Sequence, residues 1–278
     1  MTARQPRPPI GRDTRLCMSL AARPGNFGSR FHNRLYERLG LDYVYKAFIT
    51  DDLDGAVRGI RALGVRGCAV SMPFKEAVIP LLDGLAGSAA AIDSVNTIVN
   101  DDGRLTGYNT DYSAVRDLLD RAGVDPALPF SLRGSGGMAK AVAAALRDRG
   151  HRSGTIVARN ADKGRVLAAS YGFEWQAQVG DGAAVLVNAT PIGMSGSDEA
   201  ALAFAPDVIA RCAVAIEVVA LPAETPFLRA ARAAGKVTIA GADVAVLQAL
   251  EQFVLYTGVR PGGDDVAHAA AFARGEID

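Results

Sequence analysis

The 278-residue sequence is poor in the features that mark several classes of protein. It has only three cysteines, Cys17, Cys68 and Cys212, which lie far apart and lack the C-x-x-C spacing of zinc and redox sites. We therefore expect no disulfide scaffold and no metal site. Reduced thiols of this kind are typical of cytoplasmic proteins.

Long apolar runs and an excess of one charge are also absent. A membrane helix needs about 20 mostly apolar residues, but the most hydrophobic window, residues 212–223, is interrupted by Glu217 and Pro222. The first 13 residues lack the apolar segment of a secretory signal, so we expect a tail there. Thirty basic residues balance thirty acidic ones, which excludes a broad basic field. We expect neither a membrane nor a nucleic acid as partner.

What the sequence does contain is an alternation of short apolar runs with helical patterns, typical of α/β units. Apolar runs occupy residues 43–49, 67–72, 95–99, 130–133, 155–158, 184–189, 213–219 and 236–240. Helical patterns occupy residues 31–39, 53–63, 75–85, 113–123, 138–149, 226–234 and 243–256. The sequence predicts an N-terminal α/β domain, residues 1–112 completed by 245–278, and a Rossmann-like, doubly wound parallel sheet in residues 113–244. The C-terminal helices are expected to pack back on the first domain.

A glycine-rich loop lies between a predicted strand and a predicted helix. It consists of Gly134, Ser135, Gly136 and Gly137, followed by Met138 and Ala139. Glycines let the backbone approach a phosphate, and the N-terminus of the helix offers free N–H groups to a pyrophosphate. The loop therefore predicts a dinucleotide site, and the alternative is an ordinary glycine-rich turn.

The residues after the next strand indicate which dinucleotide is bound. An acidic residue there binds the ribose hydroxyl of NAD, whereas arginine accommodates the extra phosphate of NADP. The strand is followed by Arg159, Asn160 and Lys163, with Arg165 just beyond, so the sequence favours NADP. Alternatively, these cations lie on a solvated helix start, since Asp162 among them would repel a phosphate.

Two polar clusters in the first domain can carry proton chemistry. They are Ser-Met-Pro-Phe-Lys at 71–75 and Asn-Thr-Asp at 109–111. Interconversion of an alcohol and a ketone by hydride transfer needs a group that exchanges the hydroxyl proton. A lysine in a confined site, oriented by a carboxylate, can do this. Lys75 and Asp111 are the candidates; alternatively, Lys75 is a solvated lysine and residues 109–111 are a turn or helix cap.

Seven motifs, in order along nearly the whole chain, resemble those of the shikimate dehydrogenase family. They are FHN at 31–33, MPFK at 72–75, SVNT at 94–97, YNTD at 108–111, GSGGMAKA at 134–141, NATPIGM at 188–194 and ETPFL at 224–228. Gly241 and Gln248 match a late glycine and a glutamine of the family. Within the family, the chain looks like the shikimate dehydrogenase-like branch.

The resemblance implies an NADP-dependent oxidoreductase that interconverts a ring hydroxyl and a ketone of shikimate or a similar cyclic hydroxy acid. It would act in aromatic amino acid biosynthesis, as a monomer or homodimer, with residues 1–112 as substrate-binding catalytic domain. Lys75 and Asp111 would be the catalytic pair. The other residues implied are Ser71, Asn96, Gln248 and Asn26 on the substrate side, and Asn188, Thr190, Pro191 and Gly241 on the cofactor side.

Four positions depart from the family pattern. Asn26 and Gly28 stand where members that act on shikimate have a Ser-x-Ser pair for its carboxylate, Ala69 replaces an asparagine, and Ala220 replaces a tyrosine. A buried group left one hydrogen bond short costs about 1–3 kcal/mol, so we expect weak activity on shikimate itself. Two alternatives stay open: a non-catalytic NADP-binding sensor or regulatory module, and a quinate-type dehydrogenase that uses NAD.

Overall fold

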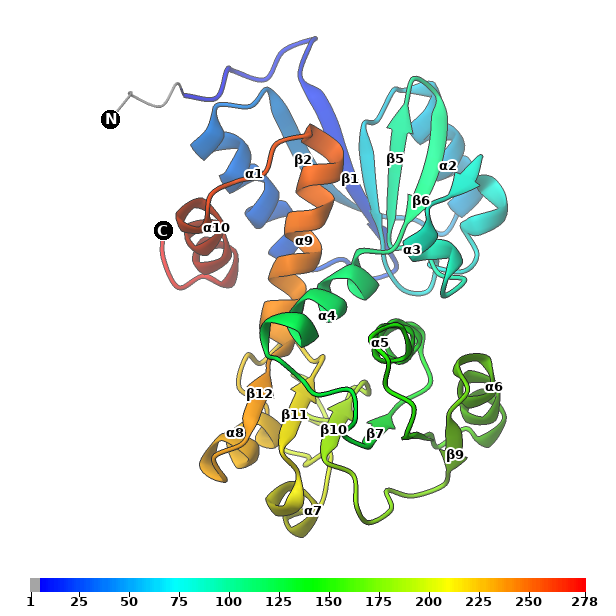
Figure 1. Ribbon diagram of the computed structural model, residues 1–278. Coiled ribbons are helices and arrows are strands. Elements are labelled where there is room, and N and C mark those ends of the chain that lie inside the picture. Colours follow the sequence, from blue (N-terminus) through cyan, green and yellow to red (C-terminus); the bar gives the residue numbers. More distant parts are fainter. Residues whose placement is uncertain (1–5) are drawn as a thin grey trace. The chain divides into compact units, whose positions relative to one another are not determined.

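The computed structural model describes residues 6–278 and divides into two compact units. The first unit comprises the chain up to Thr110 together with Val246–Asp278, and the second comprises Asp111–Ala245 (Figure 1). Part of the expected N-terminal tail, residues 1–5, lies outside the described residues, and residues 6–13 contain no helix or strand.

The sheet of the first unit has six strands in the order β2-β1-β3-β5-β6-β4. The strands are β1 (Arg15–Ala21), β2 (Tyr43–Ile49), β3 (Gly67–Val70), β4 (Gly84–Leu85), β5 (Thr97–Asp101) and β6 (Arg104–Tyr108). β1 runs parallel to β2 and β3, whereas β5 is antiparallel to β3 and to β6. Because β5 is reversed, it begins at the edge where β1, β3 and β6 end.

Helices pack on both faces of this sheet (Figure 1). On one face, α2 (Leu53–Ala62) and α3 (Gly87–Ala90) cover a core that includes Leu20 and Ile98. On the other, α1 (Phe27–Leu39) and α9 (Gly241–Thr257) enclose an aromatic cluster around His32 and Tyr256. α10 (Gly263–Arg274) packs on α1. The C-terminal helices thus pack back on the first unit, which confirms that prediction.

The prediction of a helix at residues 75–85 is wrong. Residues 72–78 form turns, which lead into the short 3-10 helix Ile79–Leu81 and then into β4. Pro80 provides the physical reason. It has no N–H to donate, its ring clashes with the preceding turn, and it disfavours the α conformation of the residue before it.

The sheet of the second unit has six parallel strands in the order β12-β11-β10-β7-β8-β9. They are β7 (Phe130–Arg133), β8 (Gly154–Val157), β9 (Glu174–Gln176), β10 (Val185–Asn188), β11 (Val214–Glu217) and β12 (Val237–Ile239). The strand order reverses at β7, as in doubly wound Rossmann sheets. The fold class predicted from the sequence is therefore confirmed.

Helices alternate with these strands along the chain and are joined to them by short connections. The helices are α4 (Thr110–Arg121), α5 (Gly137–Asp148), α6 (Ala161–Tyr171), α7 (Pro206–Arg211) and α8 (Pro226–Ala233). α5 packs against α6, and α7 packs against α8 over a core that contains Leu186 and Phe227. In such sheets ligands bind at the carboxyl ends of the strands, where the order reverses. Here that place is the edge formed by the ends of β7 and β10.

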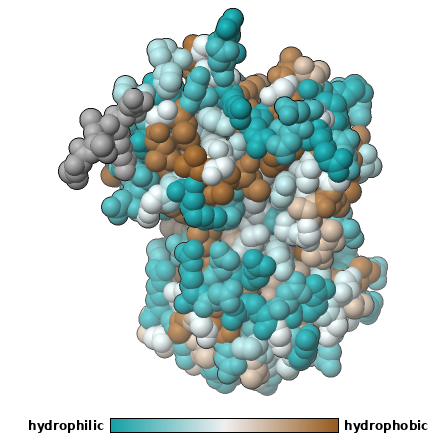
Figure 2. Space-filling model, turned by 45° about the horizontal axis from the view of Figure 1, so that its top comes forward, coloured by the Kyte–Doolittle hydropathy of each residue, from teal (hydrophilic) through white to brown (hydrophobic). Residues whose placement is uncertain are grey.

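In the part of the chain that the structure describes, no helix is both long and apolar enough to cross a membrane. The exposed apolar residues Leu63, Met72 and Val166 lie in different segments. Hydrophilic residues cover most of the face in Figure 2.

Candidate active site

Polar residues of the first unit gather at the edge where β1, β3 and β6 end and β5 begins. The N–H of Val70 donates to the carbonyl of Asn96 at 2.8 Å, and the N–H of Asn96 donates to the carbonyl of Tyr108 at 3.0 Å. These bonds place Ser71, Asn96 and Asn109 on neighbouring strand ends. The register therefore brings three residues of the polar motifs, Ser71, Asn96 and Asn109, to the same edge of the sheet.

Lys75 lies at the end of the loop that follows β3. The loop is tied to β1, since the N–H of Ser71 donates to the carbonyl of Leu20 at 2.9 Å. The N–H of Val95 donates to the carbonyl of Lys75 at 2.8 Å. Because Val95 directly precedes Asn96, this bond brings the Lys75 backbone close to Asn96. The Lys75 side chain is half-buried. This position partly shields the amine while leaving a path to it.

Asn96 is buried, and two threonines hold its side chain. Its Oδ1 accepts from Thr97 Oγ1 and from the N–H of Thr110, each at 2.8 Å, and its Nδ2 donates to Thr110 Oγ1 at 3.0 Å. Only one of the two amide hydrogens is used in these bonds, so the other can serve a ligand. Asp111 follows Thr110 in the first turn of α4 and is 2 % exposed.

Gln252 is the glutamine of α9 that bonds to this network. Its Nε2 donates to Thr97 Oγ1 at 3.1 Å and to the carbonyl of Asn96 at 3.3 Å. Gln248, the residue matched by resemblance, is half-buried one turn earlier on the same helix face. Sequence reasoning missed Gln252, because its bonding partner Thr97 lies 155 positions earlier in the chain.

The start of α1 carries two of the departures from the family pattern. Asn26 is the N-cap residue of α1, but its side chain makes no capping bond and is exposed. A Cβ on Gly28 would lie 3.5 Å from the Tyr45 hydroxyl, an ordinary contact distance. The Cβ of a side chain would therefore fit at position 28 without a clash.

In the second unit, the glycine-rich loop leads from β7 into α5. Gly134 has a φ of +133°, and a Cβ there would lie 2.5 Å from the carbonyl oxygen of Ala189, so this position requires glycine. Gly136 is the N-cap residue of α5 and makes no side-chain cap; a Cβ there would meet nothing within 4 Å. The N–H groups of the first helical turn have no side-chain cap, and a bound pyrophosphate could accept from them.

Arg159, Asn160 and Lys163 lie at the junction of β8 and α6. Asn160 caps α6, because its Oδ1 accepts from the N–H of Lys163 at 3.0 Å. The side chains of Arg159 and Lys163 are exposed. Both cations are therefore accessible to a ligand at the carboxyl end of β8.

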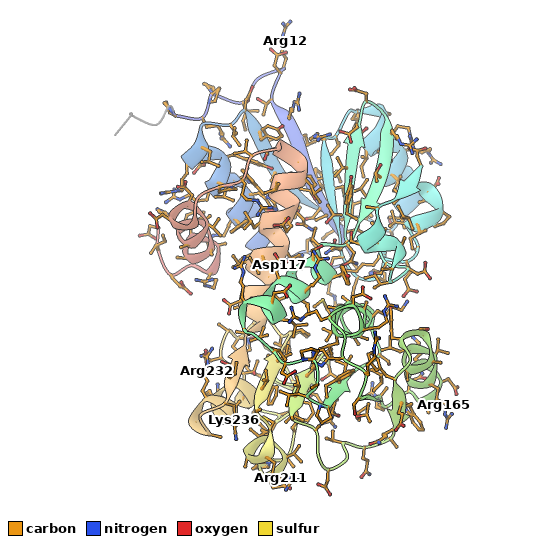
Figure 3. All side chains as sticks on the ribbon, in the orientation of Figure 1. Arg12, Asp117, Arg165, Arg211, Arg232 and Lys236 are labelled. Carbon is orange, nitrogen blue, oxygen red and sulfur yellow. The ribbon has the colours of Figure 1, made fainter. Side chains whose placement is uncertain are left out.

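Arg165 is placed differently from these two cations. Its guanidinium lies 4.4 Å from the ring centre of Trp175, and it pairs with Asp162 at 3.6 Å. In Figure 3 it lies at the outer side of α6. Asp162 thus lies beside Arg165, whose positive charge offsets its own.

The loop after β10 is held from within by Asn188, which is fully buried. Asn188 Nδ2 donates to the carbonyl of Ile192 at 3.0 Å and to Glu217 Oε1 at 2.9 Å, while its Oδ1 accepts from Thr190 Oγ1 at 2.6 Å. The Asn188 side chain is therefore committed to the protein. Thr190 is half-buried and Pro191 is exposed, so these two residues form the outer surface of the loop.

Gly241 and Ala220 lie near the ends of β12 and β11. A Cβ on Gly241 would lie 2.1 Å from the carbonyl oxygen of Val219, so the close approach of these two segments requires glycine. Ala220 is half-buried and has no polar side chain to offer a ligand.

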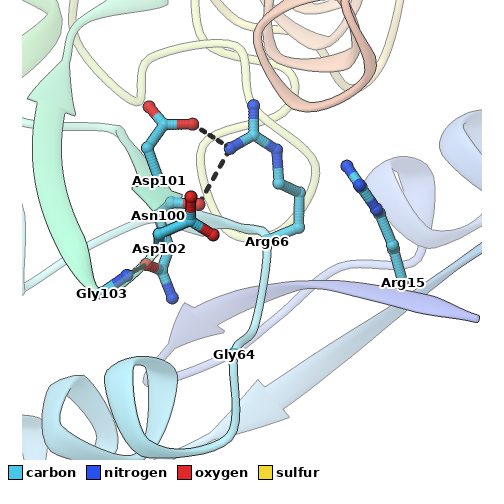
Figure 4. A pocket seen from close by; sticks show the side chains of 7 residues that line it. All are labelled: Arg15, Gly64, Arg66, Asn100, Asp101, Asp102 and Gly103. Atoms are coloured by element: carbon cyan, nitrogen blue, oxygen red, sulfur yellow. Dashed lines mark hydrogen bonds and ion pairs between the residues drawn. The ribbon is translucent and has the colours of Figure 1, made fainter. Parts of the chain in front are cut away.

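A hollow of about 390 Å³ lies at the opposite edge of the first sheet (Figure 4). Its walls come from the starts of β1 and β3 and from the turn between β5 and β6. Arg66 donates to the carbonyl of Asn100 at 2.8 Å, pairs with Asp101, and donates to the carbonyl of Tyr256 at 2.9 Å. These contacts make Arg66 a link between the sheet and the end of α9. The hollow is separate from the polar edge described above.

Comparison with known proteins identifies the family. Residues 27–98 match the model of the shikimate dehydrogenase substrate binding domain. The chain is 54% identical over 267 residues to a shikimate dehydrogenase-like protein of Haemophilus influenzae, which covers 95% of this chain and 98% of that relative. It is 38% identical over 234 residues to the NADP(+) shikimate dehydrogenase of Oleidesulfovibrio alaskensis, covering 82% and 84%.

A solved structure leads to the same family. Shikimate 5-dehydrogenase from Thermus thermophilus, in complex with NADP(H) and shikimate, aligns with a TM-score of 0.83 at 30% identity, covering 93% of this chain and 99% of the other. With a fold, a set of ordered motifs and relatives that all agree over most of its length, the chain belongs to the shikimate dehydrogenase family.

Proposed function

We propose that the protein is an NADP-dependent oxidoreductase that interconverts a ring hydroxyl and a ketone of shikimate or a shikimate-like cyclic hydroxy acid. The observation that carries this proposal is the gathering of Ser71, Lys75 and Asn96 at one sheet edge, with Asp111 directly after the last strand of that edge. The first unit binds the substrate, and the second unit binds NADP. The protein acts as a monomer or homodimer.

Lys75 and Asp111 exchange the proton of the reacting hydroxyl. Bound NADP supplies the hydride acceptor, C4 of its nicotinamide, for the carbinol carbon. The hydroxyl proton passes to Nζ of Lys75, and Asp111 stabilises the ammonium ion that forms. In the reverse direction the ammonium returns the proton to the carbonyl oxygen. Asn96 and Gln248 hold the neighbouring ring hydroxyls.

NADP is held by the carboxyl ends of β7, β8 and β10. The first turn of α5, behind Gly136, offers its N–H groups to the pyrophosphate. Arg159 and Lys163 bind the extra phosphate of the adenosine half, and Thr190 and Pro191 contact the nicotinamide half. Asn188 and Gly241 act on the cofactor indirectly. The Asn188 side chain is buried, and Gly241 is required by its close packing against the backbone of Val219.

Shikimate itself is a poor substrate in this proposal. Neither Asn26 nor Gly28 supplies a hydroxyl for its carboxylate, and Ala69 and Ala220 supply no polar group. Each hydrogen bond lost to a charged group costs about 1.5–3 kcal/mol, which is roughly a factor of 10 to 150 in kcat/KM. Asn26 remains the one polar side chain among these four, and its amide can donate to a ligand.

A panel of ring substrates tests the proposal directly. Purified protein is assayed with shikimate, quinate and related cyclic polyols, each with NADP and with NAD. Turnover with NADP on at least one of them is expected, with shikimate slow. Tight NADP binding without turnover on any of them would instead favour a non-catalytic sensor. A higher kcat/KM with NAD would overturn the assignment of Arg159 and Lys163.

Lys75→Ala tests the proton-transfer step. We expect kcat to fall by about 10²–10⁴-fold, the usual contribution of a general acid–base, while NADP affinity stays near that of the wild type. Lys46→Ala is the matched control, since Lys46 is an exposed lysine on β2 of the same unit. Turnover unchanged in Lys75→Ala would remove Lys75 from the mechanism.

A further inference from the structure

Glu217 is a buried carboxylate at the end of β11, and the mechanism above gives it no role. Its side chain is 0 % exposed. Within the residues that the structure describes, no lysine, arginine or histidine neutralises it. Burying a carboxylate costs free energy unless its oxygens are hydrogen-bonded. The identity and position of its hydrogen-bond donors therefore indicate what Glu217 does.

Both carboxylate oxygens accept bonds from two loops. Oε1 accepts from Asn188 Nδ2 at 2.9 Å and from the N–H of Val219 at 3.0 Å. Oε2 accepts from Asn188 Nδ2 at 3.1 Å and from Thr225 Oγ1 at 2.9 Å. Every partner is a donor, which suits an ionised carboxylate. A glutamine would not suit them equally, because its own NH₂ would face donors.

The partners of this carboxylate in turn fix the backbone around them. Asn188 bonds to Thr190 and to the carbonyl of Ile192 in the loop after β10. Thr225 accepts from the N–H of Leu228 at 3.3 Å and so caps α8. One carboxylate therefore connects the loop after β10, the loop after β11 and the start of α8.

We propose that Glu217 is a positioning residue for the nicotinamide half of NADP. It acts through Asn188 and Thr225, which together set the shape of the loop at residues 188–194. The inference rests on the proposed function, in which Thr190 and Pro191 of this loop contact that half of the cofactor. Hydride transfer requires close alignment, and a misplacement of about 1 Å can cost 10²-fold in rate.

The test compares Glu217→Gln with Glu224→Gln in the full-length protein. Glu224 is the matched control, because it is a half-exposed glutamate of the next loop that pairs with Arg232. The two ligands are NADP and adenosine 2′,5′-bisphosphate, which has the extra phosphate but no nicotinamide. We expect Glu217→Gln to lower kcat by about 10–100-fold and to lower the affinity for NADP. The affinity for the bisphosphate should stay at the wild-type value. Glu224→Gln should change neither value.

Two results would overturn the inference. Equal losses of affinity for both ligands, with a lower Tm, would mean that Glu217 only stabilises the second unit. Unchanged kcat and NADP affinity would mean that it positions nothing.

A second pair of variants covers the case in which Glu217→Gln is not recovered as folded protein. Thr225→Val removes the hydroxyl that donates to the carboxylate, whereas Thr225→Ser keeps it. Only the valine variant should therefore lose affinity for NADP while binding the bisphosphate as the wild type does. If the wild type turns over no ring substrate, the proposed function fails. The comparison of NADP with the bisphosphate then still decides the inference about Glu217.

Discussion

Two glycines of the loop between β7 and α5 have different surroundings. Gly134 has a positive φ and lies against the carbonyl of Ala189. Gly136 has an ordinary φ of −88° and faces open space. The first position is constrained by the protein itself, and the second is constrained only when a phosphate approaches the backbone.

Substitution by alanine separates these two roles. Gly134→Ala should lower the free energy of unfolding by at least about 1–3 kcal/mol, the cost of a disfavoured backbone conformation, before the clash with Ala189 is added. Gly136→Ala should leave the Tm close to that of the wild type but lower the affinity for NADP, because the alanine methyl group occupies the space in front of the helix. Thermal unfolding and NADP titration measure both effects. A Gly134→Ala protein with a normal Tm would contradict this account.

The residues that could be predicted from the sequence are those whose chemistry is carried by a local motif. Lys75, Asn96 and the glycines belong to short runs of recognisable residues. Gln252 and Glu217 could not be found in this way, because their importance depends on partners far along the chain. Gln252 bonds to Thr97, which lies 155 positions earlier. In the sequence, Glu217 is only an interruption of an apolar window.

At the scale of elements, apolar strands and the alanine-rich α5 were predicted from their composition alone. β9 was missed because it is three residues long, lies at the edge of its sheet and includes Glu174 and Gln176. β6 was missed because Arg104 and Thr106 break its apolar pattern. The helix expected at 75–85 failed because apolar periodicity gives no weight to Pro80. Composition thus identifies continuous apolar strands better than short strands or strands interrupted by polar residues.

The junction of β8 and α6 gives a prediction about cofactor choice. Arg159→Ala and Lys163→Ala should each lower the affinity for NADP by about 10–150-fold, the range for loss of a hydrogen bond to a charged group. The affinity for NAD should not change. Arg165→Ala is the control, since Arg165 is engaged with Trp175. Kinetics with both cofactors measure the preference. Equal losses with NAD and NADP would show that these cations do not contact the extra phosphate.

At the scale of the whole molecule, a net charge of zero at neutral pH means that overall repulsion is small. The response to acid then depends on individual groups whose pKa changes on folding. His32 is the clearest of these. It is 0 % exposed and stacks on Tyr45, with ring centres 4.5 Å apart, in the aromatic cluster of the first unit.

Burial lowers the pKa of His32 from 6.5 to about 3, with an opposing effect from Gln252. Below pH 6.5 the unfolded chain therefore binds a proton that the folded chain does not bind until about pH 3. The stability that neutral His32 contributes is full above pH 6.5 and falls by about 1.4 kcal/mol per pH unit as the pH drops through this window. The loss reaches roughly 5 kcal/mol, comparable with the whole stability of a small domain.

His32→Phe keeps a planar ring in the cluster but removes the titrating group. Denaturant unfolding of both proteins between pH 7 and pH 4 should therefore give curves of stability against pH that diverge, with the wild type losing stability faster as the pH falls. Taking the difference between the two proteins cancels the carboxylates that titrate in both. Parallel curves would mean that His32 gains its proton without unfolding, and that acid sensitivity arises elsewhere in the chain.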